Sequence, residues 1–218
     1  MFRRLFPLGL SLVVAPWFQA QTTPPAVDLF ADQGFAGWTL VSAESAKIDD
    51  ICTRTNDGVR VAGATNGYLL TDADFENYQL HLEYRWPADA APRCDSGVLL
   101  NVVAPAPTPT CIQLQTKSRY AGDLLQMGGA SFAEPVTSPA KFNLPPILSR
   151  QNPASEFPYG EWNVVDVVCQ NGAIEVRING VLQNQVTSVT PRAGRIGIQL
   201  EGAAFELRNV RVSPLPAS

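Results

Sequence analysis

The sequence has little histidine, few charged side chains and no basic tract. His81 is its one histidine in 218 residues, which excludes a metal site built from several histidine ligands. Charged residues make up 17% and hydrophobic residues 45% of the chain. This composition predicts a packed core, because long disordered chains are rich in charge and poor in apolar side chains. The net charge of −4, without clustered Lys and Arg, argues against nucleic-acid binding, which needs cations for phosphate.

Several motifs of metal and nucleophile chemistry are also missing. The sequence contains no Asp-x-Asp-x-Asp-Gly calcium loop, no C-x-x-C pair and no nucleophile elbow. A Ser-His-Asp triad would have to use His81 without such an elbow. We therefore expect no metal ion and no other cofactor, and metal binding by Asp or Glu side chains is the alternative.

The first twenty residues have the pattern of a targeting segment. Arg3 and Arg4 precede an apolar run over residues 5–14, and Ala20 offers a small residue for cleavage. The run is short for a transmembrane helix, although an N-terminal membrane anchor is the alternative. The sequence predicts a signal peptide over residues 1–20, a linker over residues 21–27 and a periplasmic or secreted protein. After cleavage we expect no stable membrane insertion.

Cysteine is scarce but even in number. The four residues are Cys52, Cys94, Cys111 and Cys169. An even count in an exported protein favours disulfides, and three pairings are possible. Four buried thiols are the alternative.

Alternating apolar and polar residues dominate the rest of the chain. In residues 78–86, His81, Glu83 and Arg85 share the polar face of one expected strand. Similar short runs occur at residues 58–62, 96–103, 110–116, 162–169, 174–178, 195–200 and 204–213. Asn171-Gly172 and Asn179-Gly180 predict hairpin turns. No window has sustained helical periodicity, so we predict an all-β sandwich or jelly roll, with one domain over residues 28–213.

A proline-rich segment interrupts this pattern. Residues 128–160 contain Pro135, Pro139, Pro145, Pro146, Pro153 and Pro158. A loop of this length in a compact domain is usually functional or disordered. We expect one long Pro-rich insertion that crosses a face or rim of the sheet and borders a binding site.

Several motifs occur in a recognisable order. Asp28-Leu29-Phe30 and Gly37-Trp38 resemble an "LF…GW" start, and residues 67–71 with 75–80 resemble "YL.T…F.DFEL". Glu83-Tyr84-Arg85 resembles an "E-aromatic-R/K" strand, and residues 95–100 resemble "NSGIFL". Residues 160–163 match "GEWN", residues 178–180 end in "NG", and residues 194–199 with 205–212 match "GRIGLQ…FRNIRI".

Together these segments resemble a bacterial family of secreted jelly-roll domains, the 3-keto-disaccharide hydrolases or 3-keto-glucoside lyase/hydratases. The resemblance implies a concanavalin-like jelly roll that binds sugar on the concave face of one sheet. It also implies cleavage of 3-keto-glycosides, with net hydrolysis. Two positions depart from the family pattern. Residues 112–114 resemble the "V-Q-I" of "E-V-Q-I", but Cys111 stands where that motif often has Glu. Residues 199–202 lie near the "QxHG" position, and Glu201 replaces its common His.

Such a reaction needs a base, donors for an enolate oxygen and an acid at the leaving group. Glu83 is our first candidate for the base with Arg85 as its electrostatic partner, because strand alternation places both on one face. Glu201 is the second catalytic carboxylate. A solvent-facing ion pair is the alternative for Glu83 and Arg85.

Polar residues on other strands complete the candidate site. His81 suits a proton shuttle, and Gln113, Gln115 and Gln199 can bind sugar hydroxyls through their amides. The expected substrate-binding residues are His81, Asp95, Ser96, Asn101, Gln113, Gln115 and Gln199. The alternative for these residues is ordinary polarity of a sheet face or surface, and the alternative for Asp95 is the start of a turn.

Three functions therefore stay open at this point. The first is a carbohydrate-active enzyme on 3-keto sugars, with a glycoside as its partner. The second is a non-catalytic carbohydrate-binding jelly roll with the same polar face. The third is a structural domain of the cell envelope, which a flat face would favour.

Overall fold

The computed structural model describes residues 25–90, 93–142 and 144–217. The predicted signal peptide over residues 1–20 and most of the predicted linker lie outside these residues. Within the described parts, no helix is long and apolar enough to cross a membrane.

The described residues form fifteen strands and one short helix. In chain order these are β1 (Val27–Asp28), β2 (Trp38–Val41), α1 (Ile48–Ile51), β3 (Cys52–Arg54), β4 (Val59–Val61), β5 (Asn66–Thr71), β6 (Tyr78–Arg85), β7 (Gly97–Ala104), β8 (Thr110–Gln115), β9 (Leu124–Met127), β10 (Ile147–Leu148), β11 (Asn163–Gln170), β12 (Ala173–Ile178), β13 (Val181–Val186), β14 (Arg195–Glu201) and β15 (Phe205–Pro214).

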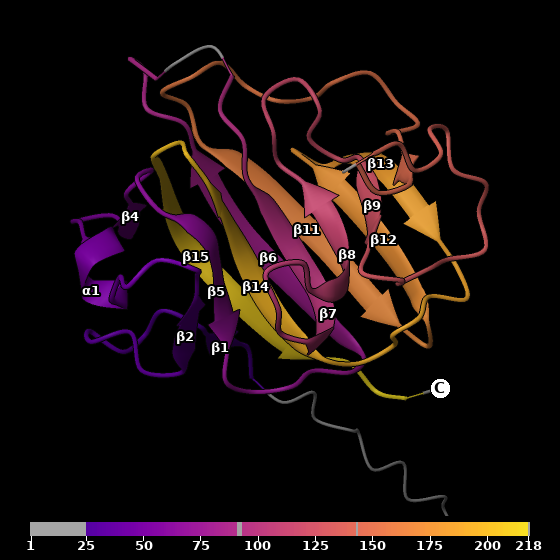
Figure 1. Cartoon of the computed structure of the whole chain (residues 1–218), viewed down its shortest axis with the longest axis horizontal. Helices are drawn as coiled ribbons and strands as arrows, with labels where there is room; N and C mark the ends of the chain where they lie inside the picture. The colour runs from indigo at the N-terminus through magenta and orange to yellow at the C-terminus, as the bar shows by residue number, and fades with distance from the viewer. Residues whose placement is uncertain (1–24, 91–92, 143, 218) are drawn as a thin grey trace, which may run out of the picture.

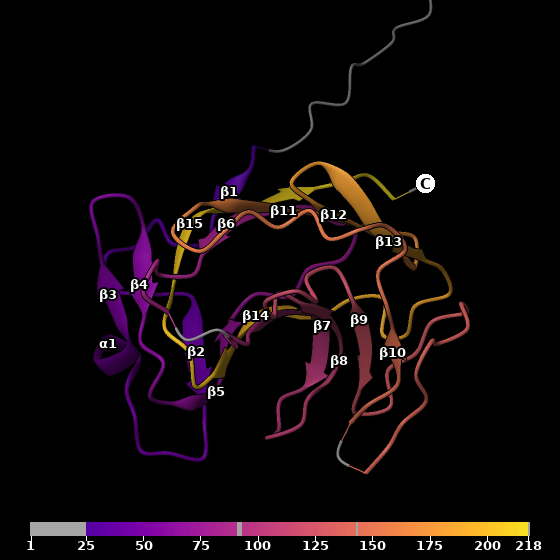
Figure 2. The same cartoon turned by 90° about the horizontal axis from the view of Figure 1, so that it is seen from above.

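The strands pack as two antiparallel sheets (Figure 1). Sheet A has the order β13-β12-β11-β6-β15-β4-β3, with β1 added on β15, and sheet B has the order β10-β9-β8-β7-β14-β5-β2. Sheet B arches so that its concave face points away from sheet A (Figure 2). The predicted all-β, concanavalin-like jelly roll is confirmed.

The period-two pattern decides which side chains enter the core between the sheets. Leu80 and Leu82 of β6 and Val165 and Val167 of β11 are buried from sheet A, and Ile198 of β14 is buried from sheet B. The side chains between them in sequence point away from the core. Each sheet therefore has one apolar inner face and one outer face that is available for polar residues.

The predicted hairpin turns are present. Asn171 and Gly172 have φ values of 52° and 75°, and Asn179 and Gly180 have values of 50° and 78°. Two successive residues with positive φ make the type I′ turn that suits the twist of a hairpin. These turns join β11 to β12 and β12 to β13.

A second apolar cluster lies on the concave face of sheet B. Its buried members are Tyr68, Leu70, Leu99, Val102 and Cys111. The connection between β7 and β8 reaches this cluster, because the Tyr68 hydroxyl donates to the Ala106 carbonyl at 2.9 Å and accepts from its N–H at 3.1 Å. The middle of the concave face is thus packed with apolar side chains, which leaves its ends for polar chemistry.

The Pro-rich segment over residues 128–160 is more ordered than a plain loop. It contains β10, which pairs with β9 at the edge of sheet B. Further on, the Asn152 amide donates to the Leu182 carbonyl and the Ser155 hydroxyl to the Ile178 carbonyl, both at 2.7 Å. The segment therefore extends sheet B and then crosses to the end of sheet A.

The expectation of disulfides is wrong for this structure. All four cysteines lie within the described residues, and they are buried thiols that form no disulfide. Burial raises the pKa values of Cys52, Cys111 and Cys169 to about 12. These thiols are therefore protonated near neutral pH, and they act as small apolar groups of the core.

Candidate functional site

A chain of polar side chains crosses one end of the concave face of sheet B. The Gln113 amide donates to the Gln115 side-chain oxygen at 3.2 Å and to the Gln199 side-chain oxygen at 2.8 Å. The Gln199 amide donates in turn to Glu201 Oε2 at 2.9 Å. The chain thus has Gln115, which accepts from Gln113, at one end and the Glu201 carboxylate at the other.

Gly97 makes this chain possible. Strand β7 lies between β8 and β14, and Gly97 pairs there with Gln115. A Cβ atom on Gly97 would lie 2.8 Å from Gln113 Nε2 and 3.0 Å from the Leu114 carbonyl oxygen. Because glycine leaves that space empty, the Gln113 amide can lie over β7 and reach both neighbours.

Two carboxylates and an ammonium group meet beyond the amides. Lys117 forms an ion pair with Asp95 Oδ2, and Asp95 Oδ1 is buried and accepts no hydrogen bond among the described residues. Glu201 is exposed at the end of β14, and partial desolvation, followed by the negative charge of Asp95, raises its pKa above its ordinary value, while Lys117 opposes this. Glu201 is therefore a stronger base than an isolated glutamate.

This end of the sandwich is also hollowed. Glu201 lines a hollow of about 290 Å³ together with Arg60, Asp89 and Arg93. A larger hollow of about 460 Å³ contains Lys117 and again Arg93. A ligand can therefore approach Glu201 and Lys117 from solvent, which the packed middle of the face does not allow.

Half of the site residues expected from the sequence meet here. They are Asp95, Gln113, Gln115, Gln199 and Glu201. Their roles in binding and catalysis stay predictions, but the structure brings them into one connected group. Among the described residues, no group of three His, Cys, Asp or Glu side chains is arranged to hold a metal ion.

Glu83, Arg85 and His81 lie elsewhere, on the outer face of sheet A. The expected partnership of Glu83 with Arg85 is wrong, because Arg85 pairs with Glu206 at 2.5 Å while Glu83 pairs with Arg208 at 2.6 Å. His81 contacts Asp166 at 2.7 Å. This group belongs to the other sheet from the amide chain.

The environment of Glu83 is unfavourable for a base. Burial raises the pKa of Glu83, but hydrogen bonds from Asn209 and Arg208, with the positive charge of Arg208 and the electrostatic interaction with His81, outweigh burial and lower it. Both carboxylate oxygens accept hydrogen bonds, at 2.6 Å from Asn209 and 2.7 Å from Arg208. Glu83 is a well-satisfied anion on the outer face.

Ser96 and Asn101 point between the sheets. The Ser96 hydroxyl donates to the Gln199 carbonyl at 2.7 Å. Asn101 accepts from the Tyr78 hydroxyl and donates to the Pro191 carbonyl, both at 3.0 Å. Both side chains stabilise the fold through these hydrogen bonds, and neither faces the concave side of sheet B.

Sequence reasoning missed Lys117, Arg93 and Arg119 at this end. Lys117 continues the alternation of Gln113 and Gln115, so its place on the same face could have been predicted by extending the strand. Arg93 and Arg119 lie in connections, where no periodicity indicates the direction of a side chain.

Comparison with known proteins agrees with this architecture. Residues 25–213 match the model of the 3-keto-alpha-glucoside-1,2-lyase-like domain. A "putative glycosyl hydrolase" from Parabacteroides distasonis is similar in structure, with a TM-score of 0.61 and 18% identity over 88% of this chain and 94% of that one. Carbohydrate binding module CBM66 from Bacillus subtilis has a TM-score of 0.57 at 9% identity, over 81% of this chain and 95% of that one. No curated protein matches the chain.

Proposed function

The chain belongs to the family of 3-keto-alpha-glucoside-1,2-lyase-like domains, and from this premise we propose that it cleaves 3-keto-glycosides at the Glu201 end of sheet B. It is a carbohydrate-active jelly-roll domain of that family. The observation that carries the proposal is the position of Glu201, a carboxylate of raised pKa at the end of an amide chain and at the wall of a hollow.

The chemistry is elimination followed by hydration. The C3 ketone makes the C2 proton acidic, and a base removes this proton so that the C–H electron pair forms an enolate. The enolate then expels the glycosidic oxygen from C1, which leaves as an alcohol after protonation, and an enone with a C1–C2 double bond remains. Water adds to C1 and a proton returns to C2, so the net result is hydrolysis.

Proton removal and enolate stabilisation each have a matching group at this end of the face, and a third group is placed to bind the sugar. Glu201 takes the C2 proton, since a base with a raised pKa holds a proton better in the transition state. Lys117 uses one of its three donors on Asp95 and has others for the enolate oxygen. Gln115 presents its amide N–H groups to sugar hydroxyls, because its oxygen already accepts from Gln113.

We further propose that the protein works in the periplasm or outside the cell. This proposal rests on the targeting pattern of residues 1–20, with Arg3 and Arg4 before an apolar run.

The test is turnover of a synthetic 3-keto-glucoside in D₂O. Free aglycone and 3-keto-glucose should appear together, and the sugar should carry deuterium at C2, because elimination exchanges that proton. A sample of unlabelled 3-keto-glucose kept in D₂O without protein controls for spontaneous exchange. Release of a sugar that keeps its C2 hydrogen would show direct hydrolysis. If no sugar is released, the proposed function is wrong.

A non-catalytic sugar-binding module is the second candidate. The amide chain of Gln113, Gln115 and Gln199 favours it, since such groups recognise hydroxyls without any chemistry. Calorimetric binding of glycans, together with no cleavage of keto-glycosides, would support this candidate over the enzyme.

Replacing Gly97 with Ala tests the amide chain. The new methyl group would displace the Gln113 amide, so we expect sugar affinity or turnover to fall by roughly tenfold, about the effect of one lost hydrogen bond. Gly34→Ala is a matched control, because its nearest contact is an ordinary 3.4 Å. Equal behaviour of the two variants in binding and turnover would show that the amide chain has no part in the site.

A further inference from the structure

The larger hollow at this end of the sandwich is strongly basic. It is lined by Arg93, Lys117, Ser118, Arg119 and Tyr120, and we call it the basic pocket. Three of these five residues are cations and none is a carboxylate, in a chain whose net charge is −4. Cations gathered against the overall charge of a protein create a local field that attracts anions.

Two of the three cations are left without a partner. Lys117 is neutralised by Asp95. Within the described residues, the guanidinium groups of Arg93 and Arg119 have no ion pair. The pocket therefore keeps two positive charges for a ligand.

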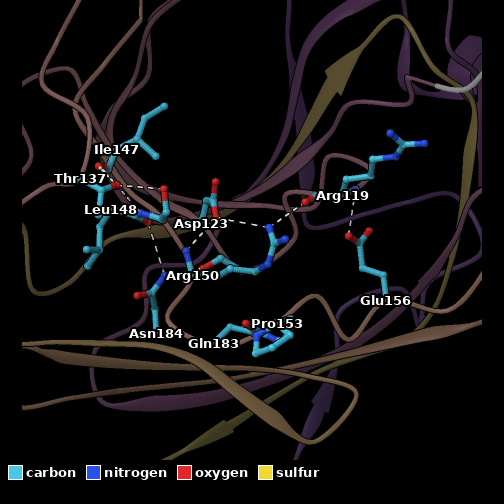
Figure 3. Close-up of polar contacts among 12 residues, drawn as sticks. Arg119, Asp123, Thr137, Ile147, Leu148, Arg150, Pro153, Glu156, Gln183 and Asn184 are labelled. Atoms are coloured by element: carbon cyan, nitrogen blue, oxygen red, sulfur yellow. Dashed lines mark hydrogen bonds and ion pairs between the residues drawn. The ribbon is translucent and has the colours of Figure 1, made fainter.

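The backbone of Arg119 is held in place from two sides. Its N–H donates to Glu156 at 3.0 Å, and its carbonyl accepts from the Arg150 guanidinium at 2.7 Å. Its φ of 72° lies in the left-handed region, which is unfavourable for a side chain other than glycine. Figure 3 shows the Arg119 guanidinium pointing away from both Glu156 and Arg150. The fold thus fixes the main chain of Arg119 and leaves its charged group presented to solvent.

Backbone hydrogen bonds of neighbouring residues bring Arg93 close to Arg119. The Thr116 N–H donates to the Ser96 carbonyl and the Ser118 N–H to the Cys94 carbonyl, both at 3.0 Å. These bonds prolong the pairing of β7 with β8 beyond the strands, so the residues that follow, Arg93 and Arg119, lie on adjoining connections. Arg93 also lines the hollow of Glu201. The basic pocket therefore adjoins the hollow of Glu201, and the two share Arg93.

We propose that the basic pocket binds the carboxylate or sulfate of an acidic sugar unit in the substrate. Guanidinium groups bind planar oxyanions through paired, charge-assisted hydrogen bonds. Tyr120, which is 52% exposed at the pocket wall, supplies an aromatic face on which a sugar ring stacks. The link between this pocket and bond cleavage rests on the proposed function, whereas anion binding itself does not.

The first test measures binding alone. Glucuronic acid, glucose 6-sulfate and glucose are titrated into the full chain by calorimetry, and into the double variant Arg93→Gln/Arg119→Gln. We expect at least one acidic sugar to bind at least tenfold more tightly than glucose, and this preference to vanish in the double variant. Equal affinity for acidic and neutral sugars in the unaltered protein would overturn the proposal.

A matched variant controls for net charge. Arg177→Gln/Arg211→Gln removes the same charge from sheet A, where Arg177 pairs with Glu175 and Arg211 contacts Asn209. It should keep the preference for the acidic sugar. If it loses the preference as fully as the pocket variant, the effect is long-range charge and the pocket is not a site.

The second test separates this inference from the proposed function. The ratio of kcat/KM for a keto-glycoside with a uronic acid aglycone to that for one with a glucose aglycone should fall about tenfold in the pocket variant. If acidic sugars bind but no keto-glycoside is cleaved, the pocket stands and the proposed reaction fails. If cleavage occurs with an unchanged ratio in the pocket variant, the reaction stands and the pocket fails.

Discussion

Replacing Glu201 with Gln is expected to lower turnover of a 3-keto-glucoside by a factor of about 10²–10⁴, the usual effect of losing a general base. Glutamine keeps the size of the side chain and can still accept the hydrogen bond from Gln199, which measures 2.9 Å. It cannot take the C2 proton. Sugar affinity, measured by calorimetry, should therefore stay within about threefold of the unaltered protein.

The pH dependence gives an independent readout. Because burial and Asp95 raise the pKa of Glu201, kcat/KM should rise with pH on an acid limb that lies above the ordinary glutamate value of 4.5. The effect of rising pH on the stability of the fold has the opposite direction. A carboxyl whose pKa is raised in the folded state is protonated more readily there than in the unfolded chain, so its ionised form disfavours folding at higher pH. Glu201→Gln should therefore not lower the melting temperature at pH 7, and the acid limb should disappear.

Glu175→Gln is the matched control, since Glu175 pairs with Arg177 on β12 of the other sheet. It should leave turnover and the acid limb unchanged. Turnover of Glu201→Gln within about threefold of the unaltered protein would assign the base to another group. Asp95, with its unused buried oxygen, would be the next residue to replace.

Strand alternation predicted the faces of this fold but not its sheets. It placed Glu83 and Arg85 on one polar face and Gln113 and Gln115 on another, and the structure confirms both assignments to an outer face. The two faces belong to different sheets, because β6 joins sheet A and β8 joins sheet B. Which sheet a strand joins depends on long-range pairing, and a period of two carries no information about it.

Local sequence patterns also fail to predict which residues meet in the candidate site. Glu201 and Asp95 are far apart in sequence, and they come together because β14 pairs with β7 through Ile198 and Val98. No local pattern predicts that register. The role of Gly97 could not be predicted from the sequence either, because it depends on the Gln113 side chain of a neighbouring strand.

The connections were the least predictable part. Residues 128–160 were expected as a loop, but they contain β10 and hydrogen bonds that attach them to sheet A. The preference for disulfides came from the even cysteine count together with the expected export of the protein. Cys111 and Cys169 are instead buried among the apolar side chains of separate clusters.

Replacing Glu83 with Gln is expected to destabilise the fold by about 1.5–3 kcal/mol, the range for hydrogen bonds to a charged group. Glu83 accepts from both Arg208 and Asn209, and its side chain is only 13% exposed. Arg208 in turn stacks on Trp162, with 4.1 Å from its Cζ atom to the ring centroid. Glutamine removes the charge that fixes Arg208 over this ring, so the loss extends beyond one ion pair.

The pH dependence of this loss follows from the lowered pKa of Glu83. A carboxyl whose pKa is lowered in the folded state adds stability above the ordinary glutamate value of 4.5. That stability is lost as the pH falls through the lowered folded pKa. Urea unfolding should therefore show a constant difference between the two proteins near pH 7, and the difference should shrink below about pH 4.

Turnover decides between the two carboxylates. Folded Glu83→Gln protein should cleave the keto-glucoside within about threefold of the unaltered rate, since Glu83 lies on the outer face of sheet A. Glu206→Gln is the control on the same face, where it breaks the neighbouring pair with Arg85. If Glu83→Gln instead kept its stability and lost turnover a hundredfold, the base would lie on sheet A, and the site would have to be sought beside Arg208 and Trp162.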